Sequence, residues 1–320
     1  LKLMASLDIS EKRLPQDGRF SLRLRDKTID VRLSTLPGQY GESVVMRLLG
    51  QGSAIRRLGQ IGMPADMLAR FREILGKDSG MVLVTGPTGS GKTTTLYAAL
   101  AEIDAEQNKI ITVEDPVEYR LPGLTQVQVN EKIELDFARV LRAALRQDPD
   151  VILVGEMRDA QTAEIGLRAA ITGHLVLSTL HTRDALSTPF RLLDMGAPPF
   201  MVATSLQAVI AQRLLRSVCQ NCAEPHAPSA QEAAWLVAVA GAEDAGQIKT
   251  VKGVGCSVCN GTGFSGRQGI YEMLEINPEM ALAVQRGDAG GFMTAARAAM
   301  KGKTLADRSL ELVRTGKTSL

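Results

Sequence analysis

Residues 86–93 have the residue types and spacing of a phosphate-binding loop. They read Gly-Pro-Thr-Gly-Ser-Gly-Lys-Thr and match the pattern G-x-x-x-x-G-K-[ST] at every fixed position. Glycines let the backbone turn tightly and point its N–H groups at phosphate oxygens, and the N-terminus of a following helix adds partial positive charge. Lys92 would reach the β- and γ-phosphates, and the Thr93 hydroxyl would bind Mg²⁺. We therefore expect ATP and Mg²⁺ to bind at Gly86, Pro87, Thr88, Gly89, Ser90, Gly91, Lys92, Thr93 and Thr94.

Acidic residues follow two apolar runs further along the chain. Residues 110–113 run into Glu114, and residues 151–154 run into Gly155 and Glu156. In open α/β sheets the ligand lies beyond the carboxyl ends of the strands, where a carboxylate can order Mg²⁺-bound water or polarise the attacking water. A Walker B strand usually ends in Asp, whereas Gly155 holds that position here. Either cluster alone fits a solvated loop, but beside the phosphate loop they predict catalytic roles for Glu114 and Glu156.

Two of the three histidines, His174 and His181, flank the apolar run 175–179. Polar residues at both ends of a buried strand often only mark its limits. Alternatively, one of the two senses the γ-phosphate or a subunit boundary. We include His181 among the candidate catalytic residues and leave the separate roles of the two histidines open.

The four cysteines form two C-x-x-C pairs, Cys219 with Cys222 and Cys256 with Cys259. Without a secretion signal, and with nucleotide chemistry present, the cytosol is the expected compartment, where thiols stay reduced and metal binding is favoured over disulfides. Four thiolates in two such pairs suit tetrahedral Zn²⁺ in a closed, structural site. The alternative is four reduced cysteines without a metal.

Length and composition indicate a globular protein with several domains. The chain has 320 residues, 45% hydrophobic and 22% charged, and carries a formal net charge of +2. A charge so near zero and an aromatic content of 4% argue against a large nucleic-acid-binding surface. No apolar run is long enough to cross a bilayer. Because the sequence opens at Leu1 in what reads as the middle of a domain, we expect upstream residues to be missing.

The elements around these motifs indicate an α/β fold. Short apolar runs at 81–85, 110–113, 151–154 and 175–179 alternate with helical segments, which predicts a parallel sheet covered on both faces. Residues 1–49 predict a small β-rich unit instead, with strands at 20–24, 28–33 and 43–48 and a hairpin turn at 25–27. We expect helices at 64–75 and 137–146, a mainly helical stretch at 188–215 broken near Pro198, and further helices over 278–314.

Taken together, these motifs resemble those of the hexameric secretion ATPases of the type II secretion and type IV pilus assembly class. The resemblance covers essentially the whole chain. It rests on the phosphate loop continued by Thr-Thr-Leu-Tyr, an aspartate box at 111–118, the segment 141–150, a Walker B element at 155–159 and a histidine box at 172–182.

The resemblance implies a RecA-like P-loop NTPase core, a smaller N-terminal α+β (PAS-like) domain and a small zinc-bound insertion. The implied boundaries are 1–75 for part of the second N-terminal domain, 76–218 for the ATPase core, 219–260 for the tetracysteine subdomain and 261–320 for the C-terminal helical part. We expect the first N-terminal domain of these ATPases to lie outside this sequence.

The resemblance also assigns roles to residues. Glu156 would be the Walker B acid. A glycine before this acid is normal in the family, so Gly155 agrees with the resemblance. Glu114 becomes a catalytic base or water-orienting group, with Glu118 a weaker candidate. Arg32 and Arg47, which on their own read as solvated strand residues, would reach the nucleotide as the domains close. Three further arginines would lie near the site or a subunit boundary, namely Arg142, Arg146 and Arg158.

The function implied is that of an ATP-hydrolysing homo-hexamer that uses ATP, Mg²⁺ and Zn²⁺. The tetracysteine site points to pilus extension or protein export rather than retraction. The expected partners are an inner-membrane platform protein and a cytoplasmic-ring adaptor, at the cytoplasmic face of the bacterial inner membrane, with no nucleic acid. Two alternatives stay open: a nucleic-acid-translocating motor, and a zinc-organised scaffold that binds nucleotide without hydrolysing it.

Overall fold

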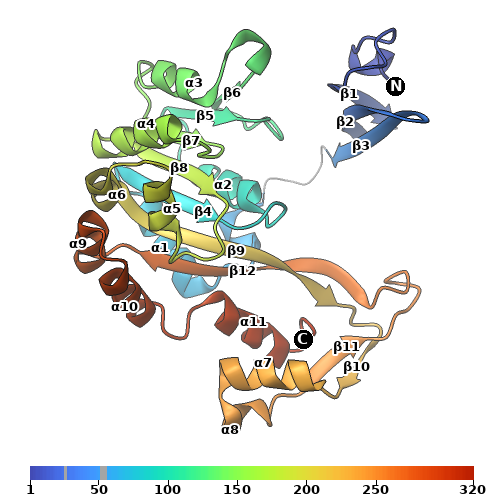
Figure 1. The fold of residues 1–320 in the computed structure, drawn as a ribbon. Coiled ribbons are helices and arrows are strands. Elements are labelled where there is room, and N and C mark those ends of the chain that lie inside the picture. The colour runs from blue at the N-terminus through green and yellow to red at the C-terminus, as the bar shows by residue number, and fades with distance from the viewer. Residues whose placement is uncertain (25–26, 51–55) are drawn as a thin grey trace. The chain divides into compact units, whose positions relative to one another are not determined.

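The computed structural model describes residues 1–24, 27–50 and 56–320, which form two compact units (Figure 1). The smaller unit comprises Leu1–Ile55 together with Glu118–Arg120, and the larger comprises Arg56–Val117 and Leu121–Leu320. Two residues of the hairpin turn predicted at 25–27, namely 25 and 26, lie outside the described residues. Helix α1 (Ala65–Leu75) lies in the larger unit, although the sequence placed a domain boundary after residue 75.

The smaller unit is built on an antiparallel sheet in the order β1-β2-β3. Its strands are β1 (Gln16–Leu24), β2 (Lys27–Gly38) and β3 (Gly41–Gly50), so all three strands expected from period-two patterning are present. On β2 the alternate residues Val31, Leu33 and Thr35 are buried. The register sets Arg32 directly between Arg19 on β1 and Arg47 on β3.

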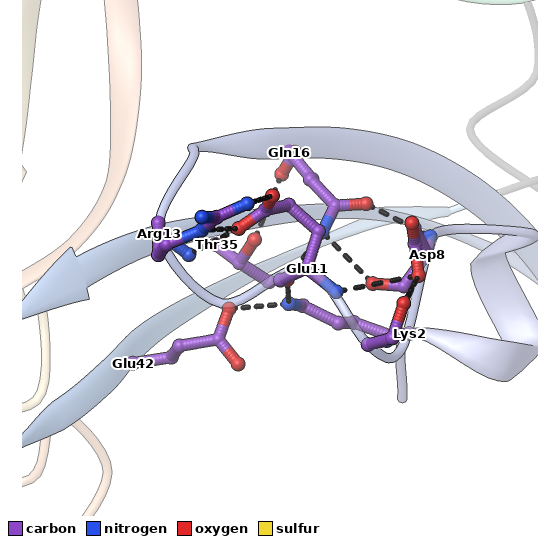
Figure 2. A network of polar contacts seen from close by, with 8 residues as sticks. Lys2, Asp8, Glu11, Arg13, Gln16, Thr35 and Glu42 are labelled. Atoms are coloured by element: carbon purple, nitrogen blue, oxygen red, sulfur yellow. Dashed lines mark hydrogen bonds and ion pairs between the residues drawn. The ribbon is translucent and has the colours of Figure 1, made fainter.

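The segment before β1 is fastened to this sheet by a polar network (Figure 2). Lys2 donates to the carbonyl of Glu11 at 2.6 Å and forms an ion pair with Glu42 on β3. The amide nitrogen of Gln16 donates to the carbonyls of Asp8 and Glu11, each at 2.9 Å. These contacts bring a short 3-10 helix (Leu3–Ala5) onto the sheet, where Ala5 is buried.

The larger unit holds a seven-stranded sheet in the order β12-β9-β4-β8-β7-β5-β6. All neighbouring strands are parallel except β12, which pairs antiparallel with β9. The four predicted parallel strands are present and buried along their length, as expected for a sheet covered on both faces. The strands are β4 (Gly80–Thr85), β5 (Ile110–Glu114), β6 (Thr125–Gln128), β7 (Val151–Val154), β8 (Leu175–Leu180), β9 (Leu206–Val218) and β12 (Phe264–Glu275).

One face of this sheet shares an aliphatic core with several helices. Leu83, Ile152 and Val176 from the sheet pack with Leu167 and Phe292 from α4 and α10. Side-chain caps fix where several helices begin; the carboxylate of Asp159, for example, accepts from the N–H of Thr162 at the start of α4. The helices of this unit that lie outside the cysteine region are α1, α2 (Lys92–Leu100), α3 (Phe137–Ala144), α4 (Ala160–Ile171), α5 (Thr188–Asp194), α6 (Pro199–Ser205), α9 (Pro278–Arg286), α10 (Ala289–Ala299) and α11 (Leu305–Arg314).

The prediction of a mainly helical stretch at 188–215 was wrong in its second half. Helices α5 and α6 are present and separated near Pro198, but residues 206–218 form β9. The segment is rich in Ala, Gln, Leu and Arg, which favour helix. Pairing to β4 on one side and to β12 on the other overrides that preference, because it places the segment inside the sheet.

The cysteine region branches out between β9 and β12 (Figure 1). It contains the antiparallel strands β10 (Ala223–His226) and β11 (Thr250–Gly253) with helices α7 (Ala230–Ala240) and α8 (Ala242–Ala245). Helix α11 lies against it, and Arg314 forms an ion pair with Asp244 at 3.2 Å. Across the described part of the chain, no helix combines the length and apolarity needed to span a membrane.

Candidate functional site

The phosphate loop follows β4 directly and ends where α2 begins at Lys92. Three of its glycines have positive φ angles, +147° at Gly86, +78° at Gly89 and +91° at Gly91. At Gly86 a β-carbon would also come within 2.5 Å of the carbonyl oxygen of Gln212 on β9. Only glycine fits that position, since both the backbone angle and the space exclude a side chain.

Lys92 is held at the loop by backbone carbonyls. Its ammonium donates to the carbonyl of Gly86 at 2.9 Å and to that of Pro87 at 3.2 Å. Burial lowers the pKa of Lys92; Glu156 raises it and Arg213 lowers it further. Thr93 and Thr94 are exposed at the N-terminus of α2, where a hydroxyl is accessible to a bound cation.

Glu156 and His181 meet beside this loop, from the ends of neighbouring strands β7 and β8. The imidazole Nε2 of His181 lies 3.8 Å from a carboxylate oxygen of Glu156. Arg158 bridges Glu156 and Asp115, reaching the latter at 3.5 Å. Burial lowers the pKa of His181, and Lys92 lowers it further while Glu156 raises it. The site therefore gathers two cations, a carboxylate and an imidazole at one edge of the sheet.

The two histidines lie at opposite ends of β8. The imidazole Nδ1 of His174 is 2.9 Å from the carbonyl of Ala169 at the end of α4, and the carbonyl of His174 accepts from the N–H of Gly80 at the start of β4. His174 thus lies at the edge of the sheet away from the phosphate loop, and of the two histidines only His181 lies with the predicted site residues.

Glu114 is placed differently from Glu156, because it is 3% exposed at the end of β5. One carboxylate oxygen accepts from the hydroxyl of Tyr97 on α2. The other accepts from the hydroxyl of Thr112 and, at 3.2 Å, from the side-chain amide of Gln126. Both carboxylate oxygens therefore already accept hydrogen bonds from the protein.

The predicted arginines lie in three places, and Arg158 is the one that contacts Glu156. Arg32 and Arg47 belong to the smaller unit, where they are cross-strand neighbours. Like charges facing each other across strands destabilise a sheet. Arg142 and Arg146 lie exposed at the end of α3, where the guanidinium of Arg146 donates to the carbonyl of Arg142 at 2.9 Å. Glu118, the weaker acidic candidate, is grouped with the smaller unit.

The four cysteines converge on one point. Their sulfurs all lie within 4.8 Å of one another, with Sγ–Sγ distances of 3.8 Å for Cys219–Cys256, 3.8 Å for Cys222–Cys259 and 3.7 Å for Cys256–Cys259. Tetrahedral Zn²⁺ with Zn–S bonds of ~2.3 Å requires sulfurs ~3.8 Å apart. The arrangement therefore fits zinc.

Backbone N–H groups complete this cysteine cluster. Gly255 donates to the sulfur of Cys222 at 3.3 Å, while Cys256 and Gly263 donate to that of Cys259 at 3.2 and 3.3 Å. The N–H of Cys256 is the main cause that lowers the pKa of Cys259, whereas burial raises the pKa of Cys222. Such outer contacts orient ligands and stabilise thiolate.

Sequence reasoning missed two side chains near the loop, Gln212 on β9 and Thr182 just after β8. Gln212 contacts the loop from behind, and the hydroxyl of Thr182 lies 2.6 Å from that of Thr85 at the end of β4. Thr182 lies within the histidine box, which gave a signal for its region. Gln212 gave none, since its segment was predicted to be helical.

A mainly parallel sheet with a phosphate loop after β4, and with a carboxylate and an imidazole after the neighbouring strands, defines a RecA-like P-loop nucleotide-binding protein. Among solved structures, the pilus retraction motor PilT with bound ADP aligns with a TM-score of 0.69 and 29% identity, over 96% of this chain and 76% of that one. The ATPase DotB of Legionella pneumophila aligns at 0.68 with 22% identity, over 96% and 75%, and supports the fold alone.

Sequence comparisons identify the family to which this chain belongs among the P-loop proteins. The type II secretion system protein HxcR of Pseudomonas aeruginosa is 48% identical over the whole chain, which spans 64% of that relative. The type IV pilus assembly ATPase PilB of Myxococcus xanthus is 50% identical over 86% of the chain and 48% of the relative. The family model described as "Type II/IV secretion system protein" matches residues 1–320. The chain belongs to this family, and it spans less than two thirds of the length of these two relatives.

Proposed function

We propose that this chain hydrolyses Mg-ATP and forms the motor part of a type II secretion or type IV pilus assembly machine. The observation that carries the proposal is the meeting of Lys92, Glu156 and His181 at one phosphate loop, drawn from the ends of three adjacent strands. Family membership and the likeness to a pilus motor with bound ADP support it.

Phosphoryl transfer is catalysed mainly by positioning and charge neutralisation, and this chain supplies groups for both. Lys92 would hold the β- and γ-phosphates, and Thr93 would bind the Mg²⁺ that neutralises the developing charge. Glu156 would position the water molecules around that cation. Its ion pair with Arg158 and the nearby imidazole of His181 would restrict the orientation of the carboxylate.

Glu114 would orient the attacking water or accept its proton. A base that works from a buried position needs a fixed direction, and the hydroxyls of Tyr97 and Thr112 provide it. Because both oxygens already accept hydrogen bonds, Glu114 must exchange one of those bonds when it acts. It would thus become active only in the closed nucleotide complex.

Arg32 and Arg47 would complete the site from the smaller unit. The two arginines are direct cross-strand neighbours, and an anion that bound both would offset the repulsion between their charges. A nucleotide that engages these arginines through its γ-phosphate favours a closed arrangement of the two units, and loss of that phosphate removes the preference. This difference in affinity would convert hydrolysis into motion.

The machine around the motor is inferred from the family. The chain would work as a homo-hexamer on an inner-membrane platform protein with a cytoplasmic-ring adaptor, at the cytoplasmic face of the membrane. The cysteine cluster would hold one Zn²⁺, which supplies structure and no chemistry. Identity to HxcR and PilB, together with that cluster, supports export or extension rather than retraction.

Phosphate release by a hexameric preparation tests this proposal. Turnover should fall about 100-fold in Lys92→Ala and in Glu156→Gln, since each change removes charge stabilisation from the transition state. Lys77→Ala is the control, because the ammonium of Lys77 bonds to Gln207, at the start of β9 and away from the loop. Equal turnover in the wild type and in both site variants would contradict hydrolysis at this loop.

A further inference from the structure

A buried glutamine stands behind the phosphate loop. Gln212 is 1% exposed in the middle of β9, more than a hundred residues after the loop. Its side-chain nitrogen donates to the carbonyl of Ser90 at 2.7 Å, and its side-chain oxygen accepts from the hydroxyl of Thr95 at 2.8 Å. Gln212 thereby ties the last turn of the loop and the first turn of α2 to the neighbouring strand.

The side-chain amide of Gln212 meets both demands of this position. The carbonyl of Ser90 needs a donor and the hydroxyl of Thr95 offers one, so the residue between them must donate and accept at once. Ser90 and Thr95 are 3% and 1% exposed, so water is excluded from replacing either bond. The bonds therefore have to come from the protein.

Two glycines of the loop lie directly against the same residue. A β-carbon on Gly86 would meet the carbonyl oxygen of Gln212 at 2.5 Å, and one on Gly91 would meet its side-chain nitrogen at 3.2 Å. The loop thus rests directly on the backbone and the side chain of Gln212. A change there alters the surface against which the phosphate-binding N–H groups are arranged.

The strand that carries Gln212 is anchored in turn. Tyr271 on β12 is its cross-strand partner, and the buried Tyr271 hydroxyl donates to the carbonyl of Ile61 at 3.0 Å. Burial raises the pKa of Tyr271, so the hydroxyl stays protonated as a donor. The segment of β9 that carries Gln212 is therefore held in place by β12.

We propose that Gln212 is a positioning residue that fixes the phosphate loop in its nucleotide-binding shape from behind. The inference rests on the proposed function, because it assumes that residues 86–93 bind nucleotide. Its loss should weaken nucleotide binding more than the chemical step, because a displaced loop loses contacts shared by the ground state and the transition state.

The experiment measures the affinity of the full chain for a fluorescent ADP analogue with Mg²⁺, alongside kcat, KM and thermal stability. Gln212→Leu removes both bonds at similar volume, and Thr95→Val removes one of them. Gln207→Leu is the matched control on the same strand, because the Gln207 side-chain oxygen bonds to Lys77. Gln212→Glu keeps the acceptor for Thr95 but, when ionised, cannot donate to Ser90.

We expect affinity to fall about tenfold in Gln212→Leu, equivalent to ~1.4 kcal/mol, and less in Thr95→Val, with kcat changed less than KM. Gln207→Leu should bind as the wild type does. In Gln212→Glu, affinity relative to the wild type should recover as the pH falls from 8 to 6, because burial raises the pKa of the new carboxyl and its protonated form donates again.

Unchanged affinity in Gln212→Leu would overturn the inference. If that variant fails to fold, the Gln212→Glu series decides, and an affinity ratio independent of pH overturns it equally. A wild type that binds no nucleotide would instead overturn the proposed function, so the two failures are distinguishable.

Discussion

The phosphate loop and the cysteine cluster are both candidate sites for small ligands beside β9, yet they are built by opposite means. At the loop, glycines and backbone N–H groups set the shape, and the charged side chains of Lys92, Glu156 and His181 stay partly exposed. At the cluster, four side chains converge within 4.8 Å and three of the cysteines are buried. A site that must exchange its ligand keeps an open face, whereas a site that must retain its ligand supplies every ligand atom itself.

This contrast predicts that changes at the loop mainly affect nucleotide affinity, whereas changes at the cluster mainly affect the stability of the fold. The loop continues a strand and a helix that are already packed, so changes in it should affect nucleotide affinity more than folding. The cluster lies where the chain passes from β9 to β10 and from β11 to β12, and a metal bound there would contribute directly to the folded state.

The largest expected effect is at the cluster. Cys256→Ser should lose the metal and lower the melting temperature by about 10 °C or more, because a structural zinc site contributes several kcal/mol. Nucleotide affinity should stay within about threefold of the wild type, since no loop residue is changed. Metal analysis should give about one Zn²⁺ per wild-type chain. Ser257→Ala, in the same C-x-x-C turn, is the control, and a wild type with under about a tenth of an equivalent of zinc would contradict the prediction.

The second effect tests the shape of the loop. Gly86→Ala should reduce nucleotide affinity about 100-fold, because it combines an unfavourable φ with a clash against Gln212. Gly89→Ala meets no atom within 4 Å and faces only the backbone penalty, so about tenfold is expected. Titration with a fluorescent nucleotide measures both. Equal losses in the two variants would show that the support behind Gly86 is unimportant.

The third effect concerns Glu114. Like the residues at the loop it is a candidate for nucleotide chemistry, and like the cysteines it is buried. Tyr97→Phe removes a hydrogen bond to its carboxylate and should lower the free energy of unfolding by about 1–2 kcal/mol. Turnover should fall as well, because the carboxylate loses its fixed direction. Denaturant unfolding and phosphate release measure the two, with Tyr40→Phe at a fully exposed tyrosine as control. Reduced stability with unchanged turnover would assign Glu114 to the fold alone.

The smallest effect is a pH dependence inside the cysteine region. Hydrogen bonds from Ser229 at the start of α7 lower the pKa of Glu232 to about 2, from an ordinary value of 4.5. A depressed folded-state pKa stabilises the fold above pH 4.5, and that contribution disappears as the pH falls toward 2. Glu232→Gln should therefore melt slightly below the wild type at pH 7 and match it near pH 2. Because the cysteines are the same in both proteins, their protonation does not affect the difference in melting temperature. A difference that stays constant with pH would refute the prediction.

The sequence predicted the loop, the four buried parallel strands and the cysteine pairs, because each depends on local pattern and spacing. It did not predict β9, whose composition favours helix until β4 and β12 surround it. It also did not predict that Glu114 is enclosed by Tyr97 and Thr112, or that Gln212 contacts Ser90. Those contacts depend on which distant strands become neighbours, and residue types alone do not contain that information.

The side branch between the cysteine pairs offers a site for attaching a label. Residues 223–255 leave the sheet beside Cys222 and return beside Cys256, so both ends of the branch are pinned at one point. Its outer turn at Gly241 and α8 is exposed and has no buried residues. An affinity tag or a fluorophore inserted there would extend into solvent while the strand register of β9 and β12 is kept. This turn is therefore a site at which the chain can be labelled for solution measurements.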